Sequence, residues 1–415
     1  IKRISALNPR KSTLSEEKDS LCTFLPMEKL RTNAVTLDET RPIHEVYGGY
    51  SYFCDGDILI AKVTPCFENG NIAIANGLVN GIGFGSTEIN VLRVNGKGHN
   101  RFLYYRLQEE QFRTIAKSEM RGTGGLKRVP TDLFESFTIG LPDTDEQATI
   151  AATLDRETAR IDALIEKKNR FVELLKEKRQ GLITHAVTKG LDRNAKMKDS
   201  GIEWIGQVPE HWEATKLKHV AAFSGGGTPS KENPDYWNGC IPWVSPKDMK
   251  HEVITDSIDH ITTKGLENSA TKLIDSGAVL LVARSGILRH TIPVGINNVP
   301  VSLNQDMKAL SLDETRVRPR FILRWVQGLN RSLLGIWAKE GATVESLEHE
   351  YVANTRLPLP DLKEQDAILA TLDLETARID ALISKSEQSI TLLKERRAAF
   401  ITAAVTGQID LRGKQ

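Results

Sequence analysis

Apolar and small residues recur three and four positions apart over two long stretches of the chain. In the first stretch these seam positions are Leu154, Ile161, Ile165, Val172, Leu175 and Leu182. In the second stretch they are Leu372, Ile379, Ile383, Ile390, Leu393 and Phe400. A mean spacing of about 3.5 residues is typical of a coiled-coil seam. Neither stretch contains proline, although Pro142 and Pro360 lie just before them, and proline is tolerated only at a helix start. The pattern therefore predicts two long amphipathic helices.

The two stretches are copies of one another. The segment from Leu141 to Asp192 returns 218 residues later, from Leu359 to Asp410, and about 31 of the 52 aligned positions are identical without a gap. An isolated amphipathic helix needs a partner for its apolar stripe, and the second copy is the obvious partner for the first. The alternative, two ordinary core helices of an all-helical protein, is disfavoured because core helices rarely run so long.

A different pattern precedes the first copy. Strand-like runs at 57–63, 71–75 and 88–94 are separated by turns rich in glycine and asparagine. A helix-like stretch covers 101–120, and a basic, glycine-rich loop covers 121–128. This succession predicts a mixed α+β domain.

The same order of features returns before the second copy. A strand-like run at 277–284 and another at 304–312 precede a helix-like stretch at 319–339 and a glycine loop at 341–344. Both blocks are expected to close on a short strand that leads into the Leu-Pro of the long helix. The aromatic opening of the second block, at 197–223, has no counterpart in the first, which indicates a shortened N-terminus.

The predicted fold is therefore α+β, with two mixed domains, two long helices and a pseudo-two-fold repeat. We place the first domain at 1–142 and the first long helix at 143–192. The second domain covers 193–358, and the second long helix with the C-terminal tail covers 359–415. Long, nearly constant helices joined to divergent domains suggest one mechanical task performed twice with two different surfaces.

Composition narrows the class of protein. The formal net charge is +1, so the overall charge gives no support for nucleic-acid binding, although charge can gather on one face. The 4 cysteines are scattered without metal-ligand spacing, as expected for reduced thiols in the cytoplasm. No apolar run reaches the length of a membrane span.

Catalytic motifs are absent from the sequence. There is no phosphate-binding loop of the G-x-x-x-x-G-K-[ST] type and no H-E-x-x-H pair. The glycine-rich run at 81–86 is interpreted as a turn between strands, and Asn233–Tyr236 as a surface loop. His211 and Glu213 spell H-x-E, but no P-C-x-x-C follows to complete a deaminase zinc site. We predict no catalytic residue and no metal ligand.

Three motifs carry a resemblance to a known family. They are Leu-Pro-x-x-x-Glu-Gln with the following Ala-Arg-Ile-Asp-Ala-Leu-Ile, the opening Asp199–Trp212, and the run Tyr236–Val244. The whole chain, with its repeat, resembles the DNA-specificity subunit of type I restriction–modification systems. The resemblance implies two target-recognition domains that each read one half of a split DNA site, separated by an antiparallel coiled coil of the two long helices.

The resemblance also implies partners and places the chemistry on them. Two methylation subunits would dock on the helices, and two restriction–translocation subunits would complete the complex. S-adenosylmethionine, ATP and Mg²⁺ would bind those partners, and this chain would hold no cofactor. The chain is thus expected to be a non-catalytic, cytoplasmic DNA-binding subunit.

Basic and amide side chains near glycine loops are the candidates for contacts with DNA, because Arg and Lys bind phosphates and Arg, Asn and Gln read base edges. In the first domain they are Lys62, Arg113, Lys117, Arg121, Thr123, Lys127 and Arg128. In the second they are Lys231, Lys247, Arg284, Arg289, Asn304, Gln305 and Lys339. For each one the simpler alternative is a solvated surface side chain.

The long helices offer a second candidate surface. Leu164, Phe171 and Leu174 lie off the seam among alternating charges, and we expect them to help dock methylation subunits. Two rival functions are a self-contained enzyme and a purely structural coiled coil. The missing catalytic motifs argue against the first, and the two divergent domains argue against the second.

Overall fold

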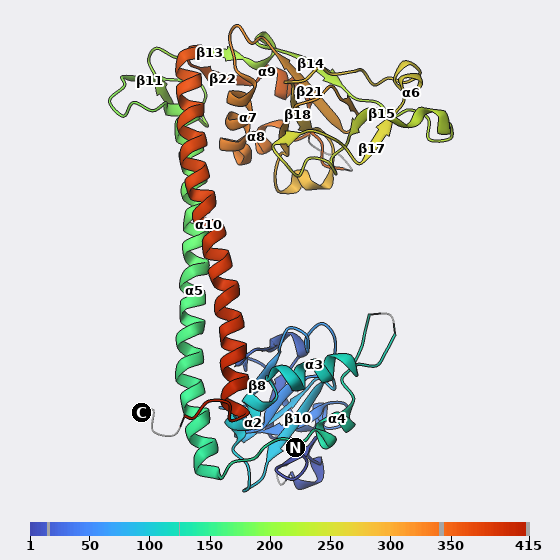
Figure 1. Ribbon diagram of the computed structural model, residues 1–415, viewed down its shortest axis with the longest axis vertical. Helices are drawn as coiled ribbons and strands as arrows, with labels where there is room; N and C mark the ends of the chain where they lie inside the picture. Colours follow the sequence, from blue (N-terminus) through green and yellow to red (C-terminus); the bar gives the residue numbers. More distant parts are fainter. Residues whose placement is uncertain (15–16, 124, 340–343, 412–415) are drawn as a thin grey trace. The chain divides into compact units, whose positions relative to one another are not determined.

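The computed structural model describes residues 1–14, 17–123, 125–339 and 344–411. The chain forms two compact units, one made of Ile1–Asn169 with Glu387–Gln415 and the other of Arg170–Ser386. Each unit contains a domain of strands and short helices together with parts of both long helices (Figure 1). The fold is thus α+β, with a pseudo-two-fold repeat, as predicted.

The first unit is built on two four-stranded sheets. One has the order β1-β10-β7-β8 and is antiparallel throughout. The other has the order β5-β2-β9-β6, with β2 and β9 parallel. The strands are β1 Ser5–Leu7, β2 Leu21–Leu25, β3 Leu30–Arg31, β4 Ala34–Val35, β5 Thr40–Pro42, β6 Ser51–Cys54, β7 Ile58–Ala61, β8 Ile72–Ile74, β9 Ile82–Gly85 and β10 Ile89–Val94. The strands expected at 57–63, 71–75 and 88–94 are confirmed as β7, β8 and β10.

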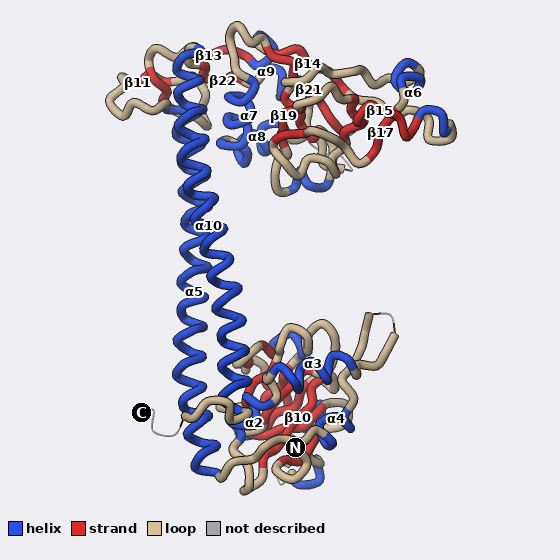
Figure 2. The backbone as a smooth tube through the Cα atoms, viewed as in Figure 1, coloured by secondary structure: helices blue, strands red, loops and turns tan. Residues whose placement is uncertain are grey.

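Figure 2 shows the short helices beside these strands. They are α1 Ile43–Val46, α2 Asn100–Arg106, α3 Glu110–Ser118 and α4 Thr131–Ser136, with 3₁₀ turns η1 Lys11–Thr13, η2 Met27–Lys29 and η3 Val79–Gly81. Phe102, Leu103 and Phe112 are fully buried against Ile58, Ile60 and neighbouring sheet residues. Aromatic side chains from the helices therefore supply much of the core of this domain.

The helix-like stretch expected at 101–120 is divided into two helices, α2 and α3. The chain leaves the helical conformation at Glu109, whose backbone is extended, with φ −62° and ψ 151°. Arg106 and Glu109 are both buried and form an ion pair at 2.6 Å, and Arg106 also donates to the carbonyl oxygen of Val405 at 3.0 Å. The break brings two buried charges together, and burial of a charge is costly unless it is paired.

The second unit repeats the plan with a larger sheet. Its five strands have the order β14-β21-β18-β19-β16, and a three-stranded sheet has the order β17-β15-β20. Two further pairs are β11 with β12 and β13 with β22. The strands are β11 Met197–Asp199, β12 Gln207–Pro209, β13 Glu213–Lys216, β14 Ala221–Gly225, β15 Trp237–Val244, β16 Val253–Ile254, β17 Asp259–Ile261, β18 Val279–Val282, β19 Val294–Asn297, β20 Ser302–Leu303, β21 Met307–Leu312 and β22 Arg356–Leu359.

In this unit, too, a helical stretch is divided into two helices. They are α6 Thr263–Glu267, α7 Pro319–Gly328, α8 Asn330–Trp337 and α9 His349–Asn354, with 3₁₀ turns η4 Leu217–His219, η5 Pro234–Tyr236 and η6 Gly286–Arg289. The helix-like stretch expected at 319–339 therefore consists of two helices, α7 and α8, with Leu329 between them. Side chains of the long helix, Gln180 and Thr184, donate hydrogen bonds to the carbonyl oxygen of Gly328, which satisfies this acceptor where the helix ends.

The long helices are α5 Thr144–Lys189 and α10 Leu362–Val405. In the first unit Asp162, near the start of α5, forms an ion pair at 2.9 Å with Arg397, near the end of α10. In the second unit Arg179, late in α5, pairs at 2.9 Å with Asp380, early in α10. The two pairs are related by the 218-residue repeat. The start of α5 also shares a core with the end of α10 in the first unit, and the end of α5 shares a core with the start of α10 in the second, so the helices run antiparallel within each unit.

The proposed seam lies on the packed side of both helices. Leu154, Ile161, Val172, Leu175, Leu372, Ile379 and Ile390 are buried, and Ile165, Leu182, Ile383, Leu393 and Phe400 are half-buried. None of these seam residues is exposed, as burial of an apolar stripe requires.

An aspartate and a glutamine at the start of each long helix, which recur in both copies, bind the helix to its domain. Asp143 and Asp361 accept hydrogen bonds from the backbone N–H of Glu146 and Glu364, both at 2.8 Å, and so cap the helix N-termini. Gln147 and Gln365 are fully buried. Gln147 receives a hydrogen bond from His99 N–H and donates to the carbonyl oxygen of Pro142, and Gln365 bonds in the same way to the loop before α7. Each glutamine thus orients the helix start against its own domain.

The closing strand expected before each long helix is present only in the second unit. There β22 pairs antiparallel with β13, from Glu213 opposite Leu359 to Lys216 opposite Arg356. In the first unit the corresponding residues, 138–141, have no strand partner among the described residues and are not a strand. The prediction of a strand here is wrong because a strand is defined by its ladder partner.

Candidate nucleic-acid interface

In the first unit the basic loop folds back on the end of β7. The backbone N–H of Thr64 donates to Lys127 at 2.9 Å, and Thr64 Oγ1 donates to the carbonyl oxygen of Gly125 at 2.6 Å. Arg121 and Arg128 pair across the loop, and Arg128 also bridges to Val63. The structure thus brings together five of the seven candidates of this domain, which are Lys62, Arg121, Thr123, Lys127 and Arg128.

The arginines of this loop already form ion pairs with acidic side chains. Arg128 donates two hydrogen bonds to Glu88, at 2.8 and 2.7 Å, and this contact lowers the pKa of the Glu88 carboxyl. Arg121 lies 3.8 Å from Asp132. Lys117 and Lys127 are exposed, and the described part of the chain contains no ion pair with either. The lysines are therefore freer than the arginines to bind phosphate.

Arg113 does not belong to this group, because its side chain contacts Phe67 and Glu68. Its guanidinium donates to the carbonyl oxygens of Phe67 and Glu68 and lies 4.5 Å from the centre of the Phe67 ring. Burial lowers its pKa. These contacts give Arg113 a structural function, in which it closes the turn that follows β7.

In the second unit the corresponding loop lies against the end of β18. Arg284 bridges to Ser346, and the N–H of Lys339 donates to the carbonyl oxygen of Ser346 at 2.8 Å. Arg284 pairs with Asp306 at 2.9 Å, Lys339 with Glu348 at 3.5 Å, and Arg289 with Glu345. The glycine loop predicted at 341–344 lies outside the described residues except for Val344.

The remaining candidates of this unit are Asn304, Gln305, Lys231 and Lys247. Asn304 is only 7% exposed, and its Oδ1 accepts a hydrogen bond from Asp306 N–H at 3.0 Å, so it shapes a turn. The neighbouring Gln305 is exposed and accepts a hydrogen bond from Thr228. Lys231 and Lys247 are exposed.

Two further residues were not selected from the sequence: Thr228, which donates a hydrogen bond to Gln305, and Trp237. The rings of Trp237 and Trp243 pack edge to face, with 5.1 Å between the ring centres. The Nε1 of Trp237 donates to the carbonyl oxygen of Ser230. The glycine run 225–227 was the available signal, because Gly226 lies so close to the backbone of Leu303 and Asn304 that no Cβ fits.

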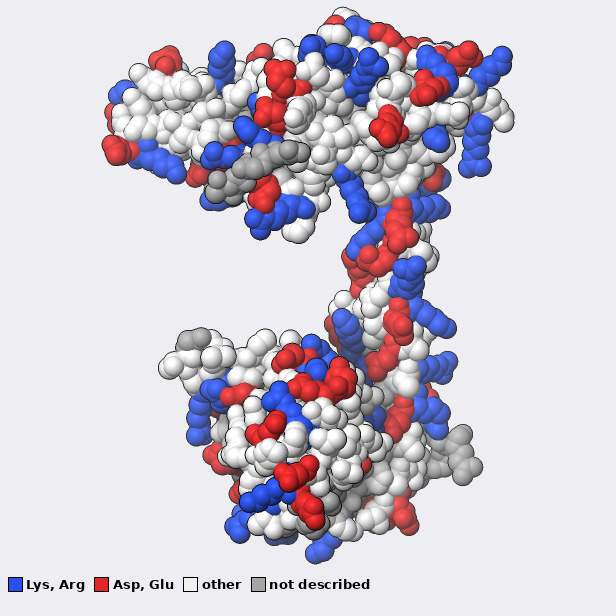
Figure 3. Space-filling model, turned by 180° about the vertical axis from the view of Figure 1, so that it is seen from behind, with Lys and Arg blue, Asp and Glu red and all other residues white. Residues whose placement is uncertain are grey.

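The charges are mixed over the surface. On the face shown in Figure 3, Lys and Arg side chains of each unit are interspersed with Asp and Glu. In the described part of the chain no group of three or more His, Cys, Asp or Glu side chains is arranged to hold a metal ion. None of the described helices is both long and apolar enough to cross a membrane.

The glycine-rich run at 81–86 is a strand, so its interpretation as a turn is wrong. It forms β9, which pairs with β2 and β6. A Cβ on Gly83 would lie 2.2 Å from the ring of Phe53. The glycines are therefore explained by sheet packing.

The long helices carry large apolar side chains in solvent. Leu164, Phe171 and Leu174 of α5 are 43%, 46% and 45% exposed. Leu382 and Leu392 of α10, which lie 218 residues after Leu164 and Leu174, are 46% and 57% exposed. Large exposed apolar side chains therefore recur at matching positions of the two copies.

Several known proteins are similar to this chain in sequence. The specificity subunit of the Escherichia coli type I restriction enzyme EcoR124I/EcoR124II is 31% identical over 225 residues, 54% of this chain and 48% of that subunit. The chain thus matches about half the length of this curated relative. The MjaVIII specificity subunit of Methanocaldococcus jannaschii is 23% identical over 340 residues, 79% of this chain and 74% of that subunit.

Two solved structures have the same fold. A chain from a structure described as the basis of complex assembly and conformational transition of the type I R-M system covers 98% of this chain and 97% of its own length, with a TM-score of 0.78 at 18% identity. The HsdS subunit of Thermoanaerobacter tengcongensis covers 98% of this chain and 95% of its own length, with a TM-score of 0.58 at 18% identity.

A family profile covers most of the repeat. The family described as Type I restriction modification DNA specificity domain matches residues 36–174 and 209–392, one match for each half of the chain. Together the two matches span well over half of the sequence, and each includes most of one mixed domain with part of a long helix. The chain therefore belongs to the type I restriction–modification DNA specificity family.

Proposed function

We propose that this chain is the DNA-specificity subunit of a type I restriction–modification complex and that its two domains read the two halves of a split DNA site. The main support for the proposal is that one part of the repeat is similar in sequence and the other part is not. The two long segments are identical at about 31 of 52 positions, whereas the two domains share only the order of their helices and strands. Divergent surfaces on constant helices suit two half-sites of different sequence, and the loops at 121–128 and around 284–289 are the proposed contacts.

The chemistry is assigned to partner subunits. S-adenosylmethionine, ATP and Mg²⁺ belong to two methylation subunits and two restriction subunits, and this chain acts in the cytoplasm without a cofactor or a catalytic residue. Support for this assignment comes from the family and from the absence of nucleotide, metal or nucleophile motifs in the sequence.

The exposed side of the long helices is the proposed docking surface for the methylation subunits. Spacings of seven and three residues place Leu164, Phe171 and Leu174 on one side of α5. Because Leu382 and Leu392 repeat two of these positions on α10, each helix offers a related surface. Two such surfaces are consistent with two copies of one partner.

Exchange of one domain tests the proposed reading of half-sites. Residues 193–358 are replaced by the corresponding segment of a relative with a different DNA target, and the complex is expressed in a host that lacks other methylation systems. Sequencing of methylated bases should show that one half-site changes while the other half-site and the spacer are retained, because each domain recognises its own half.

The matched control replaces residues 1–142 instead and should change the opposite half-site. An exchange that alters both half-sites, or neither, would contradict the proposal. Methyl transfer by the purified chain alone would argue for catalysis in this chain.

A further inference from the structure

Each unit pairs an acid with an arginine at the same place in its fold. Glu88 directly precedes β10, Asp306 directly precedes β21, and the two acids lie 218 residues apart. Glu88 pairs with Arg128 at 2.7 Å, and Asp306 pairs with Arg284 at 2.9 Å. The two domains share little sequence, but both place a guanidinium on this carboxylate.

Backbone hydrogen bonds show that the two acids occupy equivalent places. The carbonyl oxygen of Glu88 accepts from the N–H of Lys62 at 2.9 Å, and that of Asp306 accepts from the N–H of Ala283 at 2.7 Å. Lys62 directly follows β7, which pairs with β10, and Ala283 directly follows β18, which pairs with β21. Each acid therefore begins the strand that lies beside this neighbour.

The two arginines come from opposite sides of one backbone bridge. In the first unit the bridge joins Val63 to Arg128, and in the second it joins Arg284 to Ser346. Val63 and Arg284 are each the second residue after the strand, β7 or β18. The contact with the acid therefore recurs in both units, although the position of the arginine in the chain does not.

Glu88 binds only one edge of the Arg128 guanidinium. Nε donates to the two carboxylate oxygens at 3.1 and 2.8 Å, and Nη2 donates to Oε1 at 2.7 Å. In the described part of the chain Nη1 has no partner, and the side chain is 47% exposed. Because a guanidinium has five N–H donors in a planar fork, its outer edge is still able to donate to a ligand.

Arg284 is held in a similar way by Asp306. Its Nε lies 2.9 Å from Oδ1 of Asp306, and its side chain is 57% exposed. No described residue pairs with its terminal nitrogens. The carboxylates of Glu88 and Asp306 are only 26% and 23% exposed, so in both units the acid is the more buried partner and the guanidinium is the more exposed one.

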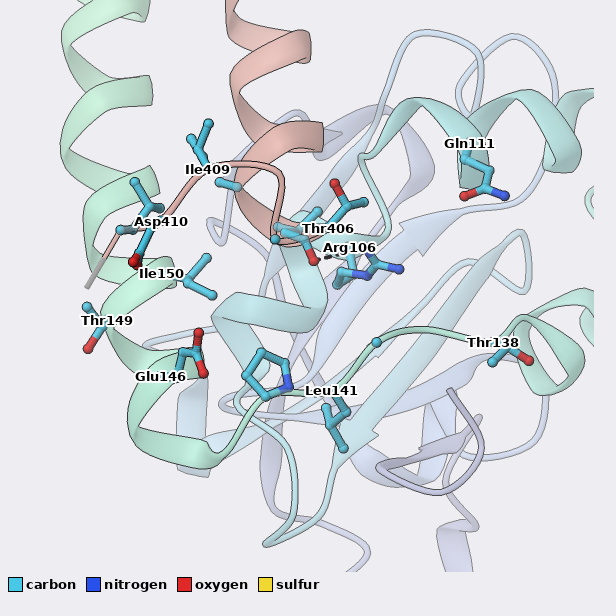
Figure 4. A pocket seen from close by; sticks show the side chains of 16 residues that line it. Arg106, Gln111, Thr138, Leu141, Glu146, Thr149, Ile150, Thr406, Ile409 and Asp410 are labelled. Carbon is cyan, nitrogen blue, oxygen red and sulfur yellow. Dashed lines mark hydrogen bonds between the residues drawn. The ribbon is translucent and has the colours of Figure 1, made fainter.

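A buried arginine of the first unit shows what a purely structural pair looks like. Arg106 lines the cavity in Figure 4, where its Nη1 donates to Glu109 at 2.6 Å and to the carbonyl oxygen of Val405 at 3.0 Å. Its side chain is 5% exposed and is enclosed by protein. The pairs of Arg128 and Arg284 are exposed instead, and exposed ion pairs contribute little to stability, so stability alone does not explain their recurrence.

We propose that Arg128 and Arg284 each read a guanine in one DNA half-site and that Glu88 and Asp306 are the positioning residues that orient them. The outer edge of each guanidinium donates two hydrogen bonds, to O6 and N7 of the guanine in the major groove. The carboxylate orients the side chain before DNA binds, which reduces the entropy lost on binding. This inference rests on the proposed function and adds the base that each domain recognises.

The test uses the assembled complex of this chain with its methylation subunits, after sequencing of methylated bases has identified the DNA site. Duplexes are prepared in which one guanine at a time is replaced by 7-deazaguanine, which lacks the N7 acceptor but still pairs with cytosine. One such replacement in each half-site should weaken binding about tenfold, because it removes a hydrogen bond from a charged donor. This loss is the N7 penalty of that half-site.

Variants of the chain assign each N7 penalty to a side chain. Arg128→Ala should abolish the penalty in one half-site and leave the other, and Arg284→Ala should do the reverse. Each variant is thus the control for the other, and the retained penalty shows that the variant is folded. Glu88→Gln should reduce the penalty assigned to Arg128 to about threefold or less, because a neutral amide holds the guanidinium less firmly than a carboxylate does.

Arg41→Ala is a further control, because Arg41 pairs with Glu39 elsewhere in the first unit, and it should leave both penalties unchanged. N7 penalties that are the same in the original chain and in both R128A and R284A would overturn the inference without affecting the proposed function. A half-site that contains no G·C base pair would do the same. A complex that binds no split site would refute the proposed function and this inference together.

Discussion

Lys117 and Lys127 differ from the nearby arginines in the contacts that their charged groups make. Arg128 is bound to Glu88 through two hydrogen bonds, and Arg113 is held against Phe67. The two lysines are exposed, and the described residues include no ion-pair partner for either. A cation without an acidic partner is available to neutralise a DNA phosphate, and each neutralised phosphate releases condensed counterions.

We therefore predict that Lys117→Ala and Lys127→Ala each weaken DNA binding by the assembled complex and reduce the slope of log affinity against log salt concentration by about one. DNA affinity measured at several NaCl concentrations tests this. As the matched comparison, Arg113→Ala should lower stability and leave the salt slope almost unchanged. Slopes that are the same for the lysine variants and the original chain would exclude both lysines from the interface.

At the scale of the element, neighbouring apolar residues of α5 have opposite environments. Ile161 is 7% exposed and lies on the packed side of the helix, whereas Leu164, three residues later, is 43% exposed. The same side-chain truncation should therefore have different effects at the two positions, since a cavity forms only where the side chain is buried.

Ile161→Ala should reduce the free energy of unfolding by about 2–4 kcal/mol, and Leu164→Ala should change it by less than about 0.5 kcal/mol. Urea denaturation followed by circular dichroism measures both. Leu164→Ala should nevertheless weaken assembly with methylation subunits in size-exclusion chromatography. Normal assembly of this variant and of Leu174→Ala would remove these leucines from the docking surface.

At the scale of the whole molecule, both long helices contribute residues to both units, because the units meet within α5 after Asn169 and within α10 after Ser386. Under the proposed function, the length of these helices sets the spacing between the two DNA half-sites. A stiff helix pair can hold a spacing that a flexible linker cannot.

Insertion of seven residues at each of these two points should lengthen the unread spacer of the DNA site by about three base pairs. Seven helical residues rise roughly 10.5 Å, and DNA advances roughly 3.4 Å per base pair. Seven residues also keep the seam in phase. Mapping of methylated sites provides the measurement, and an unchanged spacer in an active complex would refute the role of helix length.

Much of the architecture could be predicted because its signals are local. The 3.5-residue apolar spacing and the 218-residue repeat identified both long helices, and alternating runs identified β7, β8 and β10. The helix breaks at Leu107–Glu109 and Leu329 could not be predicted, since they depend on Val405, Gln180 and Thr184, which are distant in sequence. For the same reason the sequence could not show which candidate cations have acidic partners.

By itself, the sequence determined the periodicity of the helices, the duplication and the family, because these are properties of residue order. Only the tertiary structure determined that Arg128 is paired with Glu88. It also determined that Leu164 is exposed to solvent whereas Ile161 is buried. It alone revealed that β13 pairs with β22 in the second unit. Such contacts join residues far apart in the chain, and their energies depend on burial and distance, which local patterns do not encode.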